Sequence, residues 1–420
     1  MNIIQGGYVC IHLLESEKND EYRQFTGIGT SYNLICQRCR QNLEELPITL
    51  REVTQEAFYK LDSYLTDGFI GQPETFERNS NLFFVKRQVS LEFPYKGEVV
   101  SLAPQQDATI SKWVALFSSQ EIVLLDFGHN NFTLITTIVE SGFQVSNKSV
   151  LYLSYDSKFA AIVNNRESSG MIVNLHTGLV TMRLNRGDYH TRETNFPIAF
   201  FQHNHKTLVV HATEWNRLDI SDAETGEILT GRDLTYIDEQ QPEHYLNYFH
   251  ALPIISPNGS WIAEDGWVWS PFGVTRVWSL QNWLSENVWE SEDGTSIKYL
   301  TQRGYYWNGP LCWVDDKILA VWGFGDDDEW LIPAVQLFDV ETGIRIRLIA
   351  GINAETMYFD KYLFAVSSQG TEVWNIETGE RLLEDTTHIP QSFHPRTREF
   401  LTINGNGEFL VGRLSDRHQG

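Results

Sequence analysis

From about residue 82 onward, apolar residues occur in short runs that are separated by turn-forming residues. Runs of this length suit β-strands, and few of them show the 3.6-residue spacing of an amphipathic helix. Upstream, the spacing changes, and one set of apolar residues shares a helical face: Leu50, Val53, Ala57, Leu61 and Tyr64. The pattern therefore predicts a small N-terminal module with one amphipathic helix, followed by a large β-rich region.

A capping box marks the expected start of that helix. Thr49 and Glu52 have the Thr-x-x-Glu spacing in which each side chain bonds to the other residue's backbone N–H. Asp67-Gly68 is a turn signal that ends the segment. We therefore expect an α+β module over residues 1–78.

Two short units recur through the β-rich region. The first is an apolar strand, a polar residue and a Thr-Gly turn, and it occurs at 172–178, 337–343 and 373–379, with a looser copy ending at Thr225-Gly226. The second lies upstream of the first and joins two strands through a tight turn, most clearly at Ser256-Pro257-Asn258-Gly259. Paired units of this kind indicate a repeat architecture.

These units resemble those of WD-repeat-like β-propellers. In that family a Ser-Pro-Asp-Gly turn joins the two inner strands of a blade, and a Trp-Asp-x-x-Thr-Gly unit is the outer-middle strand with its exit turn. The resemblance covers roughly residues 82–415, and it implies a fold without implying a particular activity. The chain departs from the family by lacking most Gly-His dipeptides and by spacing its repeats unevenly.

Counting the units places blade centres near residues 115, 165, 210, 265, 325 and 370, with a last blade from about 390 onward. Seven blades are predicted, and six or eight stay open. The last blade has only about three strands, whereas residues 82–89 form a free strand before the first blade. Pairing the two would close the ring and remove an exposed edge. We therefore expect a mainly β propeller domain over 79–420.

Three of the four cysteines lie in the N-terminal module. Cys10-x-His12 and Cys36-x-x-Cys39 are separated by 23 residues. One tight turn can present two cysteines of this spacing to a zinc ion, and Cys-x-His on a strand puts both side chains on one face. We predict a closed structural Zn²⁺ site formed by Cys10, His12, Cys36 and Cys39; the alternative is buried thiols beside a surface histidine. Cys312 is interpreted as a small buried apolar residue.

Charge and hydropathy indicate which partners the protein binds and in which compartment it resides. The net charge of −23 opposes binding to nucleic acid and to anionic lipid, and it favours basic partners. No run approaches the roughly 20 apolar residues that span a bilayer, and the N-terminus lacks the basic region of a signal peptide. We therefore expect a cytoplasmic protein with protein partners, basic ones among them.

Several clusters could carry chemistry, and a structural role is preferred for each. Four histidines crowd one region, and the second and third could bind a metal from one strand face: His190, His203, His205 and His211. The acidic run at 326–329 lacks the alternating order of a calcium loop. Six tryptophans between 261 and 289 are predicted to pack between blades, although exposed ones would suggest a sugar site or a protein hot spot.

The leading interpretation is a non-catalytic protein-interaction scaffold. The fold signal is strong, and the sequence contains no Gly-rich phosphate loop, nucleophile elbow or His-Glu-x-x-His motif. The repeats themselves carry no chemistry, whereas a propeller offers a wide, rigid face of loops.

Two other functions are open. A propeller hydrolase or lactonase would use a channel metal held by residues that end strands, and these have a turn hydrogen bond as their ordinary role: Asp126, Asn174, Asp219, Asp339 and Asn375. Alternatively, the zinc module could recognise nucleic acid or a ubiquitin-like protein through Arg38 and Arg40, which flank Cys39.

Overall fold

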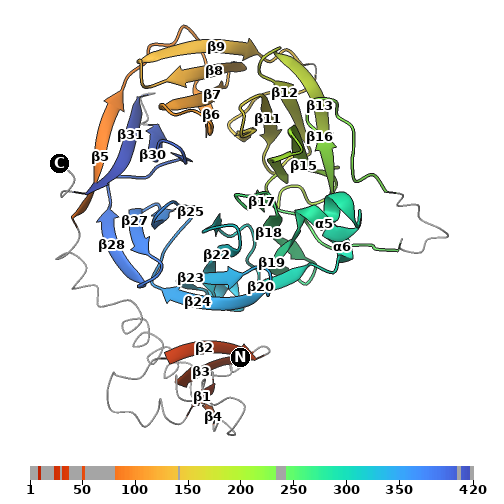
Figure 1. Ribbon diagram of the computed structural model, residues 1–420, viewed down its shortest axis with the longest axis vertical. Coiled ribbons are helices and arrows are strands. Elements are labelled where there is room, and N and C mark those ends of the chain that lie inside the picture. Colours follow the sequence, from red (N-terminus) through yellow and green to blue (C-terminus); the bar gives the residue numbers. More distant parts are fainter. Residues whose placement is uncertain are drawn as a thin grey trace.

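The computed structural model describes residues 81–140, 142–232, 243–403 and 408–416, together with the backbone of four strands nearer the N-terminus. The described part is mainly β, and seven sheets are arranged as the blades of a propeller (Figure 1). The predicted fold class and the blade count of seven are therefore confirmed.

The blades follow one another along the chain, and within each blade neighbouring strands are antiparallel. Blade 1 consists of β6 (Val99–Pro104), β7 (Lys112–Phe117), β8 (Glu121–Asp126) and β9 (Asn131–Thr137). Blade 2 consists of β10 (Ser149–Leu153), β11 (Phe159–Asn164), β12 (Ser169–Asn174) and β13 (Leu179–Asn185). Blade 3 has three strands, which are β14 (Ile198–His203), β15 (Lys206–Glu214) and β16 (Arg217–Asp222).

The remaining blades each have four strands. Blade 4 consists of β17 (Ile254–Ile255), β18 (Trp261–Val268), β19 (Phe272–Ser279) and β20 (Lys298–Gly304). Blade 5 consists of β21 (Leu311–Trp313), β22 (Ile318–Phe324), β23 (Ile332–Asp339) and β24 (Ile344–Ala350). Blade 6 consists of β25 (Thr356–Phe359), β26 (Leu363–Ser367), β27 (Gly370–Asn375) and β28 (Glu380–Asp385). Blade 7 consists of β29 (Ser392–His394), β30 (Glu399–Ile403), β31 (Phe409–Asp416) and β5 (Leu82–Val89).

Blade 7 joins the two ends of the propeller region. β5 pairs antiparallel with β31 along its whole length, from Leu82 opposite Asp416 to Val89 opposite Phe409. The strand that opens the region is therefore the outermost strand of its last blade (Figure 1). This pairing closes the ring, so the last blade does not end in an exposed edge at β31.

The core lies between blades, and this explains the apolar runs of the sequence. All six residues of β11 are buried because this middle strand is covered by a blade on each side. One apolar cluster joins Val114 and Leu116 of blade 1 to Leu151 and Ile162 of blade 2. Outer strands such as β13 alternate between exposed and covered residues instead.

The Thr-Gly units are turns that follow the third strand of a blade. Asn174 ends β12, and its Oδ1 atom accepts hydrogen bonds from the backbone N–H groups of His176 and Thr177. Gly178 then adopts a φ of +72°, a conformation that favours glycine. The unit is recognisable in sequence because its turn geometry needs both residue types.

Blade 4 carries an insertion between its third and fourth strands. Two short helices, α5 (Leu280–Ser285) and α6 (Glu290–Asp293), lie on its outer side next to blade 3 (Figure 1). Ser279 caps α5, because its side chain accepts a hydrogen bond from Asn282 N–H. None of the described helices is long and apolar enough to cross a membrane.

In the N-terminal part, four strands form a sheet of order β2-β3-β1-β4. They are β1 (Tyr8–Cys10), β2 (Arg23–Ile28), β3 (Ser31–Cys36) and β4 (Leu50–Glu52). The expectation that a helix begins at Thr49–Glu52 is wrong, because β4 pairs antiparallel with β1. Backbone pairing across 40 residues outweighs a local capping signal there. The rest of the expected helix, residues 53–78, lies outside the described residues.

Candidate interaction face

Two kinds of loop lie at one end of the propeller: the links between blades and the turns between the second and third strands of each blade. Because the strands of a blade alternate in direction, the links between blades emerge at the same end as the turns between second and third strands. We call this end the interblade face. Around blades 3 and 4 it is formed by residues 186–197, 215–216, 243–253, 269–271 and 305–310.

Two of these loops, 186–197 and 305–310, are joined by hydrogen bonds. The indole Nε1 of Trp307 donates to the backbone oxygen of Glu193 at 2.8 Å, and the side-chain amide of Asn308 donates to the same oxygen at 2.9 Å. The backbone N–H of Asn195 donates in return to Asn308 Oδ1 at 3.3 Å. The loop that enters blade 3 and the loop that leaves blade 4 thus hold one another in place.

A buried carboxylate, that of Asp265, holds the loop 305–310 in place by a hydrogen bond. Asp265 of β18 is 1% exposed, and its Oδ2 accepts the N–H of Gly309 at 2.7 Å. Its Oδ1 accepts from Thr275 at 2.7 Å and from the guanidinium of Arg303 at 2.6 Å. Gly273 lets the loop pack directly on β19, because a Cβ there would collide with the backbone of Tyr306.

Four aromatic rings form a continuous stack across the face, and we call them the ring stack: Tyr189, Phe249, Trp267 and Trp307. Phe249 and Trp267 are its centre, with centroids 4.1 Å apart and planes 8° from parallel. They exchange both backbone hydrogen bonds, so the two side chains lie directly opposite each other. The outer members, Tyr189 and Trp307, lie 5.8 and 5.2 Å from their neighbours with planes inclined by 23°.

Further aromatic side chains flank the ring stack and reach solvent. Trp215 lies 4.5 Å from Phe249 and 5.2 Å from Tyr189, and Trp269 lies 5.2 Å from Trp267. Tyr189 and Trp269 are 46% and 44% exposed, whereas Phe249 and Trp267 are almost fully buried. Together they form a surface patch with a rigid centre and an accessible rim.

A hollow of about 540 Å³ lies beside the end of the ring stack. Its walls include Arg166, Glu193, Trp307, Trp322 and Glu355. These residues come from blades on opposite sides of the ring, so the hollow lies near the centre of the interblade face. The stack therefore leads from the rim of blade 3 toward the centre of the propeller.

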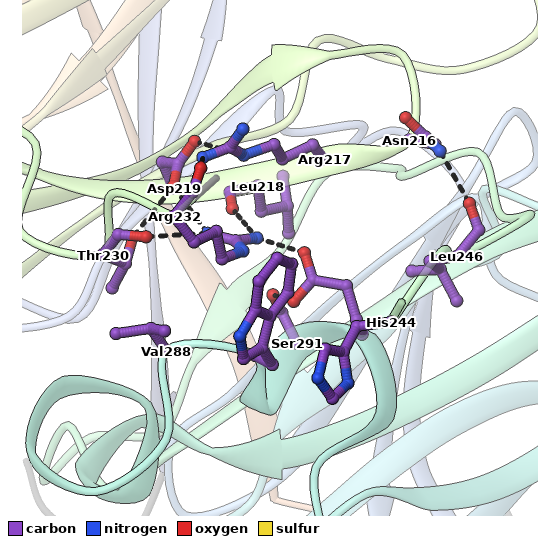
Figure 2. Close-up of polar contacts among 12 residues, drawn as sticks. Asn216, Arg217, Leu218, Asp219, Thr230, Arg232, His244, Leu246, Val288 and Ser291 are labelled. Carbon is purple, nitrogen blue, oxygen red and sulfur yellow. Dashed lines mark hydrogen bonds and ion pairs between the residues drawn. The ribbon is translucent and has the colours of Figure 1, made fainter. Parts of the chain in front are cut away.

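A network of buried charges supports the rim of blades 3 and 4. The side chain of Arg232 is 1% exposed, and its guanidinium bonds to Asp219 at 2.6 Å, to the backbone oxygen of Leu218 at 2.9 Å (Figure 2), and to Glu292 of α6. Arg217 Nε lies 3.0 Å from the other oxygen of Asp219. The guanidinium of Arg232 thus covers part of the strand edge that a fourth strand of blade 3 would cover.

The same network reaches the segment that leads into blade 4. Trp289 lies between Arg232, whose guanidinium is 5.3 Å from its ring, and His244, whose ring is stacked on it at 4.6 Å. The side chain of Asn216 donates to Leu246 O at 2.7 Å (Figure 2). The segment that carries Phe249 is therefore anchored a few residues before it joins the ring stack.

A second buried ion cluster lies behind Phe249. His250 and Arg276 both contact the carboxylate of Glu264 at 2.9 Å. Burial alone would raise the pKa of Glu264, but its contacts with His250 and Arg276 hold this pKa below its ordinary value. The carboxylate therefore stays charged and also accepts the N–H of Ala251.

The four histidines that are close in sequence are not brought to one site. His190 lies on the interblade face, whereas His203 and His205 lie at the opposite end of blade 3, around the turn between β14 and β15. His211 is buried in β15, 2.9 Å from Ser221 Oγ, and burial lowers its pKa. Among the described residues, no group of three or more His, Cys, Asp or Glu side chains could hold a metal ion.

The five residues considered as channel-metal ligands lie on third strands of separate blades. Four of them end their strands and accept turn hydrogen bonds: Asp126, Asn174, Asp339 and Asn375. Asp219 belongs to the network around Arg232 instead. Because the first strand of each blade is innermost, these side chains do not converge on the channel.

The tryptophans divide between core and surface. Trp278 and Trp283 are fully buried between blade 4 and blade 3, and Trp267 is 3% exposed, which confirms core packing for these three. For Trp269 the core prediction is wrong, because it follows β18 in an exposed turn.

The acidic run at 326–329 and Cys312 both have structural roles. Asp327 caps the short 3-10 helix η1 (Asp328–Trp330), and the backbone oxygen of Asp326 accepts the N–H of Gly304. Cys312 is 9% exposed in the core of blade 5, and burial raises its pKa to about 12. The interpretation of Cys312 as a buried apolar residue is confirmed.

The interblade patch was not foreseen from the sequence. Its members come from five separate segments between residues 189 and 307, and no local pattern joins them. The only available signal was the Trp267-x-Trp269 pair, which precedes a turn and so places one of its rings near solvent.

Comparison with known proteins identifies a fold. No family model matches the chain, and no curated protein matches it. Of the solved structures, 1218 chains match, so the likeness does not select one function. A chain in the crystal structure of the mitotic checkpoint complex aligns with a TM-score of 0.50 and 10% identity, over 81% of this chain and 94% of that one. At this identity the likeness shows the fold alone: the chain is a seven-bladed β-propeller.

Proposed function

We propose that the protein is an interaction scaffold that binds a partner protein through the interblade face of blades 3 and 4. The observation that carries this proposal is the aromatic patch, whose rim residues Tyr189 and Trp269 are exposed beside a fully packed centre. Such half-exposed aromatic side chains on a rigid base are the usual hot spots of protein interfaces.

Further observations support this proposal. The loops are held by side chains and not only by their own turns, as the Trp307–Glu193 and Asp265–Gly309 contacts illustrate. A face fixed in this way loses little conformational entropy on binding. A similar propeller occurs in a multiprotein complex, which is consistent with protein partners.

The proposal predicts that removing the exposed rings weakens partner binding. We expect the Tyr189→Ala/Trp269→Ala variant to lose at least tenfold in affinity for its main partner, because truncating a hot-spot aromatic side chain costs roughly 2 kcal/mol or more. The measurement is quantitative mass spectrometry of proteins captured from native cells by the tagged full-length chain. Tyr299→Ala is a matched control, since Tyr299 is 65% exposed on the outer strand β20. Equal capture by the double variant and the wild type would reject this face as the binding site.

We also propose a structural zinc ion in the N-terminal part of the chain. β1 and β3 pair in parallel, with Tyr8 opposite Asn33 and Val9 opposite Leu34. Cys10 ends β1 and Cys36 ends β3, so the backbone brings these two positions to the same end of neighbouring strands. His12 and Cys39, the other predicted ligands, lie outside the described residues. The proposal rests on this pairing together with the Cys-x-His and Cys-x-x-Cys spacing.

The zinc proposal predicts one zinc ion per chain in the purified protein. The Cys36→Ser/Cys39→Ser variant should lose the metal and become protease-sensitive within residues 1–78, while the propeller melts at the wild-type temperature. Elemental analysis, limited proteolysis and thermal unfolding measure these effects. Cys312→Ser is the control, since it removes a thiol without touching the motif. Full zinc content in the double variant would contradict the proposed ligand set.

A further inference from the structure

Two exposed carboxylates are next in sequence to Tyr189, which is exposed, and Trp215, which is half-buried. Asp188 precedes Tyr189 in the loop that enters blade 3, and Glu214 precedes Trp215 at the end of β15. The two aromatic rings lie 5.2 Å apart at 63°. Both carboxylate side chains are exposed, and neither forms an ion pair with any described residue.

The two carboxylates belong to one surface. A Cβ added to Gly187 would lie 3.9 Å from Glu214 Oε2, so this carboxylate lies against the loop one residue before Asp188. The nearest cations of the loop do not neutralise the pair. Arg186 is buried and donates to the backbone oxygens of residues 167, 191, 194 and 195, while Arg192 is exposed four residues beyond Asp188.

Two like charges on one surface repel each other, and a cation that binds between them relieves this repulsion. The ring faces add a second attraction, because the face of an aromatic ring carries a negative potential. Tyr189 is stacked on Phe249 through one face, and its 46% exposure leaves other parts of the side chain open to solvent. The site thus offers two exposed carboxylates next to an aromatic surface.

We infer that the partner presents an arginine to this site, with its guanidinium on the Tyr189–Trp215 pair and its N–H groups directed to Asp188 and Glu214. This inference rests on the proposed interaction function and names the chemistry of its partner. A planar guanidinium stacks on a ring while it donates in its own plane to carboxylates. A lysine ammonium is a compact, strongly hydrated charge and does not combine both contacts in this way. The net charge of −23 further favours a basic segment.

The test uses the full-length chain and three end-capped peptides of sequence Gly-Ser-X-Gly-Ser-X-Gly-Ser, in which X is arginine, lysine or citrulline. Binding is followed by the fluorescence of the patch tryptophans and by calorimetry at low salt. We expect the arginine peptide to bind at least fivefold more tightly than the lysine peptide, and the citrulline peptide to show no binding. Asp188→Asn/Glu214→Gln should weaken arginine-peptide binding at least tenfold.

Glu227→Gln/Glu377→Gln is the matched control, because it makes the same charge change at exposed turns of the opposite face. This variant should bind the arginine peptide like the wild type. Equal affinity for arginine and lysine peptides, or equal loss in both double variants, would overturn the inference.

Capture of the partner by the two double variants of the full-length chain tests this inference separately from the proposed function. If Tyr189→Ala/Trp269→Ala loses the partner and Asp188→Asn/Glu214→Gln retains it, the scaffold function stands and the arginine inference fails. If both variants retain the partner, the interblade face is not the binding site.

Discussion

Replacing Arg232 by alanine is expected to destabilise the propeller by about 3–5 kcal/mol. The guanidinium contacts Asp219 and Glu292, whose side chains are 1% and 5% exposed. Without it, Glu292 stays buried without a cation, and Asp219 retains only Arg217 as a charged partner. The backbone oxygen of Leu218 also loses its donor. Chemical denaturation of wild type and variant measures the difference in the free energy of unfolding.

Two comparisons identify the origin of that loss. Arg183→Ala removes an arginine from an ion pair with Glu140 in which the arginine is 74% exposed, and it should cost less than about 1 kcal/mol. Arg232→Ala/Glu292→Gln should be more stable than Arg232→Ala alone, because it removes the unpaired buried charge. If Arg232→Ala costs no more than Arg183→Ala, the network does not support blades 3 and 4.

A second large effect is expected on acidification, and it originates at His388. The ring is fully buried between β5 and blade 6, with its centroid 4.6 Å from Phe84, and neither of its nitrogens has a hydrogen-bond partner among the described residues. Burial, with a smaller contribution from Lys86, lowers the pKa of His388 to about 4; Asp385, which pairs with Lys86, opposes the shift. The histidine is therefore neutral in the folded protein at pH 6.

The direction of the pH dependence follows from the lowered pKa. Between pH 6.5 and about 4 the unfolded chain binds a proton at His388 and the folded chain does not. The contribution of the neutral histidine is thus complete above pH 6.5 and is lost as the pH falls toward 4. Lowering the pKa of His388 from 6.5 to about 4 corresponds to about 3 kcal/mol of folding free energy.

Unfolding measurements from pH 7 to pH 4 test this effect. The difference in stability between His388→Leu and the wild type should grow in favour of the variant as the pH falls. The other buried histidines of the described residues, His211, His250 and His394, are present in both proteins, so their contributions cancel. His176→Leu is the control because His176 is exposed, and it should change nothing. Parallel curves for His388→Leu and wild type would contradict the assignment.

The blades were predictable because their signals are local. A Thr-Gly unit requires a polar acceptor at the strand end and a glycine of positive φ, as at Asn174 and Gly178, and both residue types are visible in one short stretch. The long interval between Gly226 and Gly343 also has a local origin. This segment contains the α5–α6 insertion and the link between blades 3 and 4.

The departures from that pattern depend on distant residues. In blade 3, which has three strands, the edge of β16 is covered by the backbone of residues 227–229 and by the Arg232 side chain, which bonds to Leu218 O. The local capping signal at Thr49–Glu52 is overridden by pairing with β1. The aromatic patch joins residues that are up to 118 positions apart, Tyr189 and Trp307, through a stack that only the closed ring creates. Such contacts have no signature in a single sequence.

The central claim, that a partner protein binds the interblade face of blades 3 and 4, is tested most directly by photo-crosslinking in native cells. A photoreactive phenylalanine is placed at Arg192, beside the patch, and in a second protein at Glu377, at an exposed turn of the opposite face. We expect a defined protein to crosslink from position 192 and not from position 377. Crosslinks from position 377 alone, or none from 192, would contradict the account.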